Sequence, residues 1–206
     1  MQAAAISRVP SFRTLPALLW LLAVLPMLSA CGYNTIPTAE ETAKAAWSEV
    51  LNQYQRRADL IPNLVETVKA YAAHEKDTLQ AVVEARAKAT QVTVTPETLT
   101  DPNAFKAFQD SQAGLTASLS RLLAVVENYP DLKANQNFLA LQSQLEGTEN
   151  RIAVARRDYI EAVRAYNTEL KTFPGMLWAM TVFRGNKPMA EFTANDAAQT
   201  APQVKF

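Results

Sequence analysis

The sequence predicts an all-α fold: an elongated, antiparallel, up-and-down bundle of about four long helices, with an N-terminal lipoprotein signal and an irregular C-terminal tail. Only five of the 206 residues are glycine, and alanine, leucine, glutamate, glutamine and lysine are common, a composition that favours helix. Apolar residues recur in alternating steps of three and four. This is the 3.5-residue period of helices that pack at a shallow angle.

The N-terminal segment, residues 1–30, has the layout of a secretory signal. Arg8 and Arg13 precede an almost wholly apolar run over residues 15–28, and small residues then lead directly to Cys31, the only cysteine. A small-residue cleavage site before a cysteine resembles a lipobox. We therefore expect Cys31 to be acylated, palmitate being one such chain, to become the new N-terminus and to tether the protein to a membrane, where two or more acyl chains hold firmly.

The alternative is a single-pass inner-membrane protein with an uncleaved N-terminal helix. A spanning helix needs about 20 apolar residues, and Pro16 and Pro26 interrupt a shorter run. The lipid-anchored protein would face the periplasm or the cell exterior. In lipoprotein sorting an aspartate after the cysteine signals inner-membrane retention, so Gly32 favours the outer membrane where the organism has one.

The charge balance does not indicate a nucleic-acid partner. Removing residues 1–30 leaves 18 basic and 20 acidic residues, a net charge of −2, and there is no basic block of the kind that nucleic acid attracts. Once Cys31 is acylated no thiol remains. We therefore expect neither redox chemistry nor cysteine catalysis.

The helical bundle is predicted over residues 38–175, after a short tether at residues 31–37. Thr38 and Glu41 form a capping-box pattern that opens the first helix. Pro62 then predicts a kink or a restart, and Asp59 could cap that restart. The apolar residues expected on the first helix are Ala43, Trp47, Val50, Tyr54 and Ile61, and those of the second run, which fades near Gln91, are Leu64, Val65, Val68, Tyr71, Leu79, Val82 and Val83.

Two further helices follow. Asp101 and Pro102 predict the start of the third helix, which ends at Pro130, and the fourth helix continues to Phe173. We call the inward-facing stripe along which a helix packs on its neighbours its seam. The seam residues expected on these two helices are Phe105, Phe108, Gln112, Leu115, Leu119, Leu122 and Val126, then Phe138, Leu141, Leu145, Thr148, Ile152, Ala155, Tyr159, Ala162 and Tyr166. The short connection predicts an antiparallel pair. An extended coiled-coil dimer is the alternative, but several of these aromatic residues are bulky for a two-stranded seam.

The C-terminal region, residues 176–206, has a different character. Residues 176–183 are apolar without helical periodicity. We expect them to fold back over one end of the bundle, and a membrane- or partner-contacting patch is the alternative. The last residues are expected to be mobile.

Polar residues gather in two parts of the chain and form a candidate interhelical or partner-binding cluster. An ordinary solvated helix face is one interpretation. The other is a cluster in which Arg57 and Asp59 meet residues of the fourth helix and fix the bundle's register, as Gln112 and Thr148 at seam positions suggest. The candidates are Arg56, Arg57, Asp59, Asn63, Glu66, Glu146, Glu149, Asn150, Arg156 and Arg157.

The inventory of reactive side chains argues against an enzyme. His74 is the only histidine, so neither a di-iron bundle site nor a zinc-protease helix can be built. We predict no metal site, no cofactor and no catalytic residue. Glu146 and Glu149 share a helix face, but so do many solvated carboxylate pairs.

Several stretches resemble the LemA family of bacterial membrane-associated proteins. They are residues 56–69 (RRADLIPNLVETVK), 71–76 (YAAHEK), 127–134 (ENYPDLKA), 145–159 (LEGTENRIAVARRDY), 166–167 (YN) and 173–175 (FPG). The resemblance implies a helical bundle displayed outside the cytoplasm, with no established enzymatic activity or cofactor. Many members have an N-terminal membrane helix, whereas this chain ends its apolar run at a lipobox.

These observations lead us to expect a non-catalytic, lipid-anchored scaffold or adaptor for another membrane or envelope protein. The alternative is a lipid- or peptide-binding helical module gated by residues 176–183. An enzyme that uses carboxylates is a third and weaker hypothesis.

Overall fold

The structure is a computed structural model that describes residues 32–92 and 95–193. The predicted signal segment, Cys31 and residues 194–206 lie outside the described residues. The helices are α2 (Thr35–Tyr71), α3 (Lys76–Gln91), the 3-10 helix η1 (Pro96–Thr100), α4 (Pro102–Val126), α5 (Pro130–Lys133), α6 (Gln136–Glu169) and α7 (Gly175–Thr181). Within these two ranges there is no strand.

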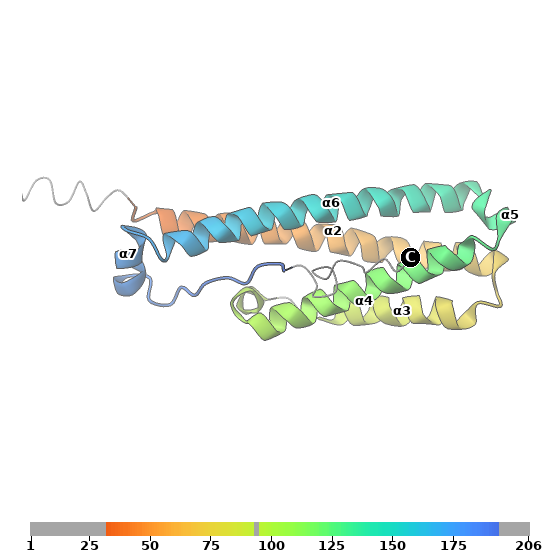
Figure 1. Ribbon diagram of the computed structural model, residues 1–206, viewed down its shortest axis with the longest axis horizontal. Coiled ribbons are helices and arrows are strands. Elements are labelled where there is room, and N and C mark those ends of the chain that lie inside the picture. Colours follow the sequence, from red (N-terminus) through yellow and green to blue (C-terminus); the bar gives the residue numbers. More distant parts are fainter. Residues whose placement is uncertain (1–31, 93–94, 194–206) are drawn as a thin grey trace, which may run out of the picture.

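The helices form a long rod built from two antiparallel pairs (Figure 1). The longest helices, α2 with 37 residues and α6 with 34, lie side by side over its whole length. The shorter helices α3 and α4 form the second pair and cover part of α2. At about 1.5 Å per residue α2 is roughly 55 Å long. The predicted all-α antiparallel bundle of four long helices is confirmed.

The third predicted helix, α4, agrees with the sequence prediction most closely. Asp101 caps it, because its carboxylate accepts from the backbone N–H groups of Asn103 at 2.9 Å and Ala104 at 3.3 Å. All seven predicted seam residues are buried, from Phe105 to Val126. The helix ends at Val126, and the short helix α5 fills the connection to α6.

The first helix begins earlier than predicted. α2 starts at Thr35 rather than at Thr38, and the chain there is already part of the bundle rather than a tether. The reason is that Ile36 is fully buried, so packing continues to the first turn. Pro37 is tolerated because it lies within that turn, where a backbone N–H has no partner in the helix.

Pro62 neither breaks α2 nor requires a cap from Asp59, which instead accepts from Gln55 on the same helix at 2.7 Å. A proline lacks the N–H that would bond to the carbonyl four residues earlier, here that of Ala58. Arg86 of α3 supplies the missing donor: its Nε–H donates to the Ala58 carbonyl at 2.8 Å. The helix therefore continues through the proline.

The first turn of the bundle lies at residues 72–75 instead, between α2 and α3. The sequence prediction treated this region as one continuous run. Ala72 is buried and its N–H bonds to the carbonyl of Val68. Two of the predicted seam residues, Tyr71 at the end of α2 and Val83 on α3, are exposed at 43% and 49%.

The fourth helix and the tail also differ from the prediction. α6 ends at Glu169, and Phe173 is exposed. The following α7 packs beside the start of α2 at one end of the rod, as residues 176–183 were expected to do (Figure 1). The chain then runs back along the bundle and buries Met189 and Phe192. The bundle therefore extends past residue 175, since these side chains complete its core.

Two apolar cores result, one at each end of the rod. The first lies at the α7 end and surrounds Trp47, Phe105, Tyr159 and Phe192. The second lies at the α5 end and contains residues such as Leu64. None of the helices in the described ranges combines the length and the apolar character that crossing a bilayer demands.

Candidate functional site

A layer of polar side chains separates the two apolar cores. Arg57 stands between Tyr54 of the first core and Ile61 of the second on α2. Gln112 stands in the same way between Phe108 and Leu115 on α4. On α6 the corresponding residues are Thr148 and Glu149. We call Arg57, Gln112, Thr116 and Glu149 the polar layer, because these four side chains are joined by hydrogen bonds.

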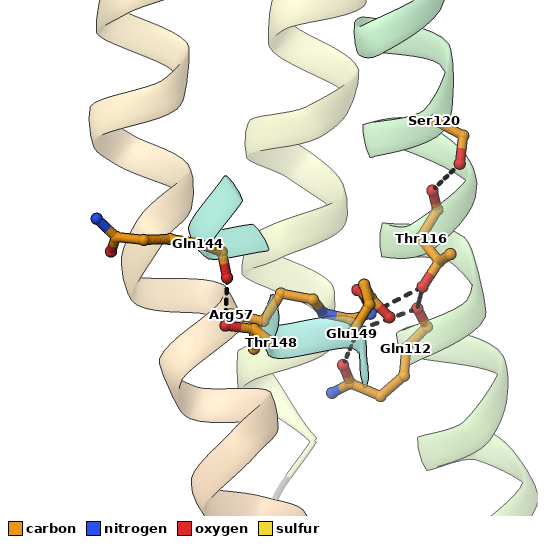
Figure 2. A network of polar contacts seen from close by, with 7 residues as sticks. All are labelled: Arg57, Gln112, Thr116, Ser120, Gln144, Thr148 and Glu149. Atoms are coloured by element: carbon orange, nitrogen blue, oxygen red, sulfur yellow. Dashed lines mark hydrogen bonds and ion pairs between the residues drawn. The ribbon is translucent and has the colours of Figure 1, made fainter. Parts of the chain in front are cut away.

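Arg57 is the centre of the polar layer (Figure 2). Its side chain is 1% exposed. Nη1 donates to Glu149 Oε1 and to Thr116 Oγ1, both at 2.8 Å. Nη2 donates to Gln112 Oε1 at 2.7 Å. A buried cation costs free energy unless it is paired and hydrogen-bonded, and both terminal nitrogens meet that condition.

The polar layer ties all four long helices together. The side-chain Oε1 of Gln112 accepts from Arg57 of α2, while its Nε2 donates to the backbone carbonyl of Ala89 of α3 at 3.3 Å. The Thr116 hydroxyl donates to the backbone carbonyl of Gln112, one turn earlier on α4, at 3.1 Å. Together with Glu149 of α6 this network makes contacts with all four long helices. The Nε of Arg57 is buried and has no partner among the described residues.

Glu149 lies on the open side of the layer, between α4 and α6. Its side chain is 43% exposed. A cavity of about 500 Å³ extends from it toward the α7 end, and a hollow of about 440 Å³ extends toward the α5 end. Thr116 and Glu149 line both. We call these two hollows together the α4–α6 groove.

The two ends of the α4–α6 groove differ chemically. The cavity toward α7 is lined by Tyr54, Arg156 and Phe192, and the Arg156 guanidinium lies 4.3 Å from the centre of the Phe192 ring. Burial raises the pKa of the Tyr54 phenol, with the charges of Arg156 and Arg57 acting in the opposite direction. The hollow toward α5 is lined by leucines such as Leu119 and Leu123. The groove thus offers a cationic, aromatic end and an aliphatic end.

The structure brings only some of the candidate residues together. Arg57 and Glu149 meet across the bundle, and Arg156 lines the same groove. Asp59, predicted to reach the fourth helix, bonds only within α2. The remaining candidates are exposed. Three of them bond to a neighbour on the same helix: Glu66 to Lys69, Glu146 to Gln142 and Arg157 to Asp158. Arg56, Asn63 and Asn150 lie on the surface.

Thr148 is not part of the polar layer although it is fully buried. Its hydroxyl donates to the Gln144 carbonyl one turn earlier at 2.7 Å (Figure 2). It also accepts from Arg151 of α6 at 3.0 Å. The Thr148 hydroxyl therefore finds its hydrogen-bond partners within its own helix. Of the two polar seam residues that the sequence singled out, only Gln112 connects helices.

Among residues 32–92 and 95–193, no three histidine, cysteine or acidic side chains lie together as metal ligands. The polar layer holds one cation and one anion, whose charges balance. Arg57 is enclosed, whereas the open groove presents Glu149 and Arg156.

A model of the LemA family matches residues 46–206. The chain belongs to the LemA family. It is similar to two magnetosome proteins MamQ, at 28% identity over 189 residues in Paramagnetospirillum magneticum and at 29% over 190 residues in Magnetospirillum gryphiswaldense. Both comparisons cover 84% of this chain and 70% of the relative. Protein LemA of Metamycoplasma hominis is 28% identical over 140 residues, 68% of this chain and 57% of the relative.

The stretches that resemble LemA proteins contain both charged partners of the polar layer. Arg57 lies in residues 56–69, and Glu149 lies in residues 145–159. A signal for Arg57 was present in the sequence, because it continues the seam of Val50, Tyr54 and Ile61 in steps of four, three and four. The seam therefore marks which of two adjacent arginines faces inward.

A second group of residues in this LemA-family chain holds the C-terminal segment, and the sequence analysis did not assign it that role. Asn167 both accepts from the Met189 N–H and donates to the Met189 carbonyl, each at 2.9 Å. The phenols of Tyr159 and Tyr166 donate to the carbonyls of Ala190 and Lys187. We call Tyr159, Tyr166 and Asn167 the tail clasp. An extended segment without periodicity gave no sign of its partners.

Proposed function

We propose that this LemA-family protein is a non-catalytic, lipid-anchored cell-envelope protein that serves as a scaffold or adaptor for another membrane or envelope protein. The observation that carries the proposal is the continuous α2–α6 pair, which begins immediately after the lipobox-like segment. A pair of uninterrupted helices is a stiff spacer. Arg57 stands 22 residues into α2, about 33 Å from its start at 1.5 Å per residue.

The polar layer supports this proposal. A polar group within an apolar seam specifies the alignment of helices at some cost in stability, and a scaffold needs fixed surfaces more than it needs maximum stability. Anchorage through Cys31 to the outer membrane, where one is present, would place the α4–α6 groove at a set height above the lipid. The partner would meet the rod from the side.

In-cell crosslinking of the tagged full chain followed by mass spectrometry tests the proposal, with Cys31→Ala as the matched control. We expect one dominant envelope-protein partner, which is lost when the anchor is lost, and incorporation of labelled palmitate into the parent chain alone. A chain that is not acylated would overturn the lipid anchor. A protein without any specific partner would overturn the adaptor role.

A second candidate function, a lipid- or peptide-binding module, is favoured by the α4–α6 groove. Its aliphatic end is walled by Leu119, Leu123 and Leu145, and ligand sites are mostly apolar with a few placed polar groups. Ser120 lines this hollow. We expect Ser120→Trp to fill it and to abolish co-purification of an apolar ligand, while Ser143→Trp on the exposed face of α6 leaves that ligand in place. Equal co-purification in both variants would exclude the groove as the site.

A further inference from the structure

The exposed apolar side chains of the described residues are concentrated at one end of the rod. Ten large apolar side chains are exposed, and six of them lie on or beside α7. The other four are scattered along the bundle, which is ordinary for a protein surface. A concentrated patch marks an interaction site. We call it the α7 patch, made of Tyr33 (43% exposed), Phe173 (77%), Met176 (39%), Leu177 (49%), Met180 (64%) and Val182 (52%).

The N-terminus of the described chain is fixed against the same end. Tyr33 packs edge-on against Trp178, with ring centres 5.4 Å apart, and against Phe183 at 5.6 Å. Gly32 has φ of +121°, and a side chain there would come within 2.9 Å of the Pro174 ring. Only glycine lets the chain enter so close to the turn before α7. The position of residue 32 relative to α7 is therefore built into the fold.

The apolar run of the N-terminal segment ends only four residues before Gly32, at Leu28. Four residues of fully extended chain reach at most about 14 Å. The headgroup region on each side of the hydrocarbon core is itself about 5–8 Å deep. Whether residues 15–28 span the bilayer or are cleaved and replaced by acyl chains on Cys31, α7 is thus held at the lipid surface. This step depends on the membrane anchorage that is part of the proposed function.

The residues around the patch suit a membrane interface. Exposed Lys171 and Arg184 lie two residues from Phe173 and Val182 in the chain, and exposed Lys187 follows three residues after Arg184. Cationic side chains are attracted to anionic lipid headgroups. Tyr33 and Trp178 belong to the residue types that are enriched at the level of the headgroups. We propose that the α7 patch inserts into the interfacial region of the membrane that anchors the chain, so that the rod is held by two points rather than by a flexible tether.

Site-specific photo-crosslinking in cells tests this inference. A photoreactive amino acid is introduced into the full chain at Met180, and in matched variants at Val154 and Leu139, which are each 47% exposed but lie in the middle and at the far end of α6. We expect phospholipid adducts at position 180 at least about tenfold above those at 154 and 139. These exposed positions tolerate substitution, and unchanged thermal melting confirms that each variant folds.

Three outcomes are distinct. Adducts confined to position 180 support insertion. Equal lipid adducts at all three positions, or protein adducts at position 180, overturn it even when the chain is in the membrane fraction, and the latter assigns the patch to a protein partner. A chain absent from the membrane fraction shows instead that the anchorage fails, and the inference falls together with that part of the proposed function.

Discussion

The Arg57 guanidinium and the Glu149 carboxylate, 92 residues apart in the chain, meet at 2.8 Å between two apolar cores. Removing one partner of a buried ion pair costs about 3–5 kcal/mol. Because Glu149 is 43% exposed, water can reach the site and reduces the free-energy cost of removing its carboxylate. We expect Glu149→Ala to lower the free energy of unfolding by about 1–3 kcal/mol, measured by urea denaturation.

The matched control is Glu146→Ala, one turn earlier on α6. Glu146 is exposed and bonds only to Gln142 on its own helix, so its removal should change stability by no more than about 0.5 kcal/mol. Equal losses in the two variants would mean that the polar layer contributes nothing specific.

Gln112→Leu tests whether Arg57 needs Gln112 as a hydrogen-bond partner. A leucine in an apolar seam ordinarily raises stability, and the seam pattern alone predicts that result. Here it removes the acceptor that Arg57 Nη2 uses at 2.7 Å, and an unsatisfied buried donor costs about 1–3 kcal/mol. We expect a loss of that size. Thr148→Val should be nearly neutral, since Thr148 bonds only within α6. A gain in stability from Gln112→Leu would contradict this account.

Pro62 and Arg86 should be energetically coupled. Arg86→Met removes the donor that satisfies the Ala58 carbonyl, and we expect it to cost about 1–2 kcal/mol in the parent chain. In a Pro62→Ala background the backbone N–H of residue 62 can bond to that carbonyl, so the same change should cost less. A double-mutant cycle by chemical denaturation measures the difference. Lys88→Met, also on α3, controls for the loss of a surface charge, and additive effects would refute the coupling.

The tail clasp should control access to the C-terminal segment. Asn167 makes two hydrogen bonds to the backbone of Met189. We expect Asn167→Ala to increase hydrogen exchange at residues 186–193 and to speed chymotryptic cleavage after Phe192, because local opening then costs less free energy. Asn150→Ala, on the exposed face of the same helix, should leave both rates unchanged. Unaltered exchange in Asn167→Ala would show that apolar packing alone holds the segment.

Buried phenols should make the protein sensitive to alkali. Burial raises the pKa of Tyr159 and of Tyr166 above the ordinary value of 10.0. The folded chain then holds these protons more tightly than the unfolded chain does. Their contribution to stability is complete below about pH 10 and is lost as the pH rises toward the folded-state pKa values.

Denaturation curves from about pH 8 to about pH 11 test this sign. Tyr159→Phe should be less stable than the parent at pH 8, because the hydrogen bond to the Ala190 carbonyl is lost. It should also show a shallower decline above pH 10. Parallel curves for the two proteins would contradict a titrating Tyr159.

The sequence predicted what depends on periodicity. All seven seam positions of α4 and the Asp101 cap follow from residue spacing and from a local hydrogen-bond motif. It did not predict the turn at residues 72–75, which contains neither glycine nor proline and which only the packing of α3 on α2 requires. It predicted a kink or a restart at Pro62 and could not tell that α2 continues, because the compensating donor, Arg86, lies 28 residues from Ala58.

The candidate site was predicted only in part for a similar reason. Arg57 could be chosen over Arg56 from the seam, but Glu149 could not be chosen over Glu146, since both lie near the seam of α6. Which of them reaches Arg57 depends on the axial alignment of α2 against α6. The tail clasp depends on an extended segment whose contacts are all distant in the chain. Contacts of this kind produce no periodic pattern in the sequence.

The position of Phe192 has a consequence for biosynthesis. Its ring lies 5.9 Å from that of Trp47, so the core on α2, a helix made early in translation, is covered only after residue 192 has been made. A nascent chain that stops before residue 192 would leave Trp47, Phe105 and Tyr159 partly uncovered. We expect the α7 end of the rod to mature after the α5 end.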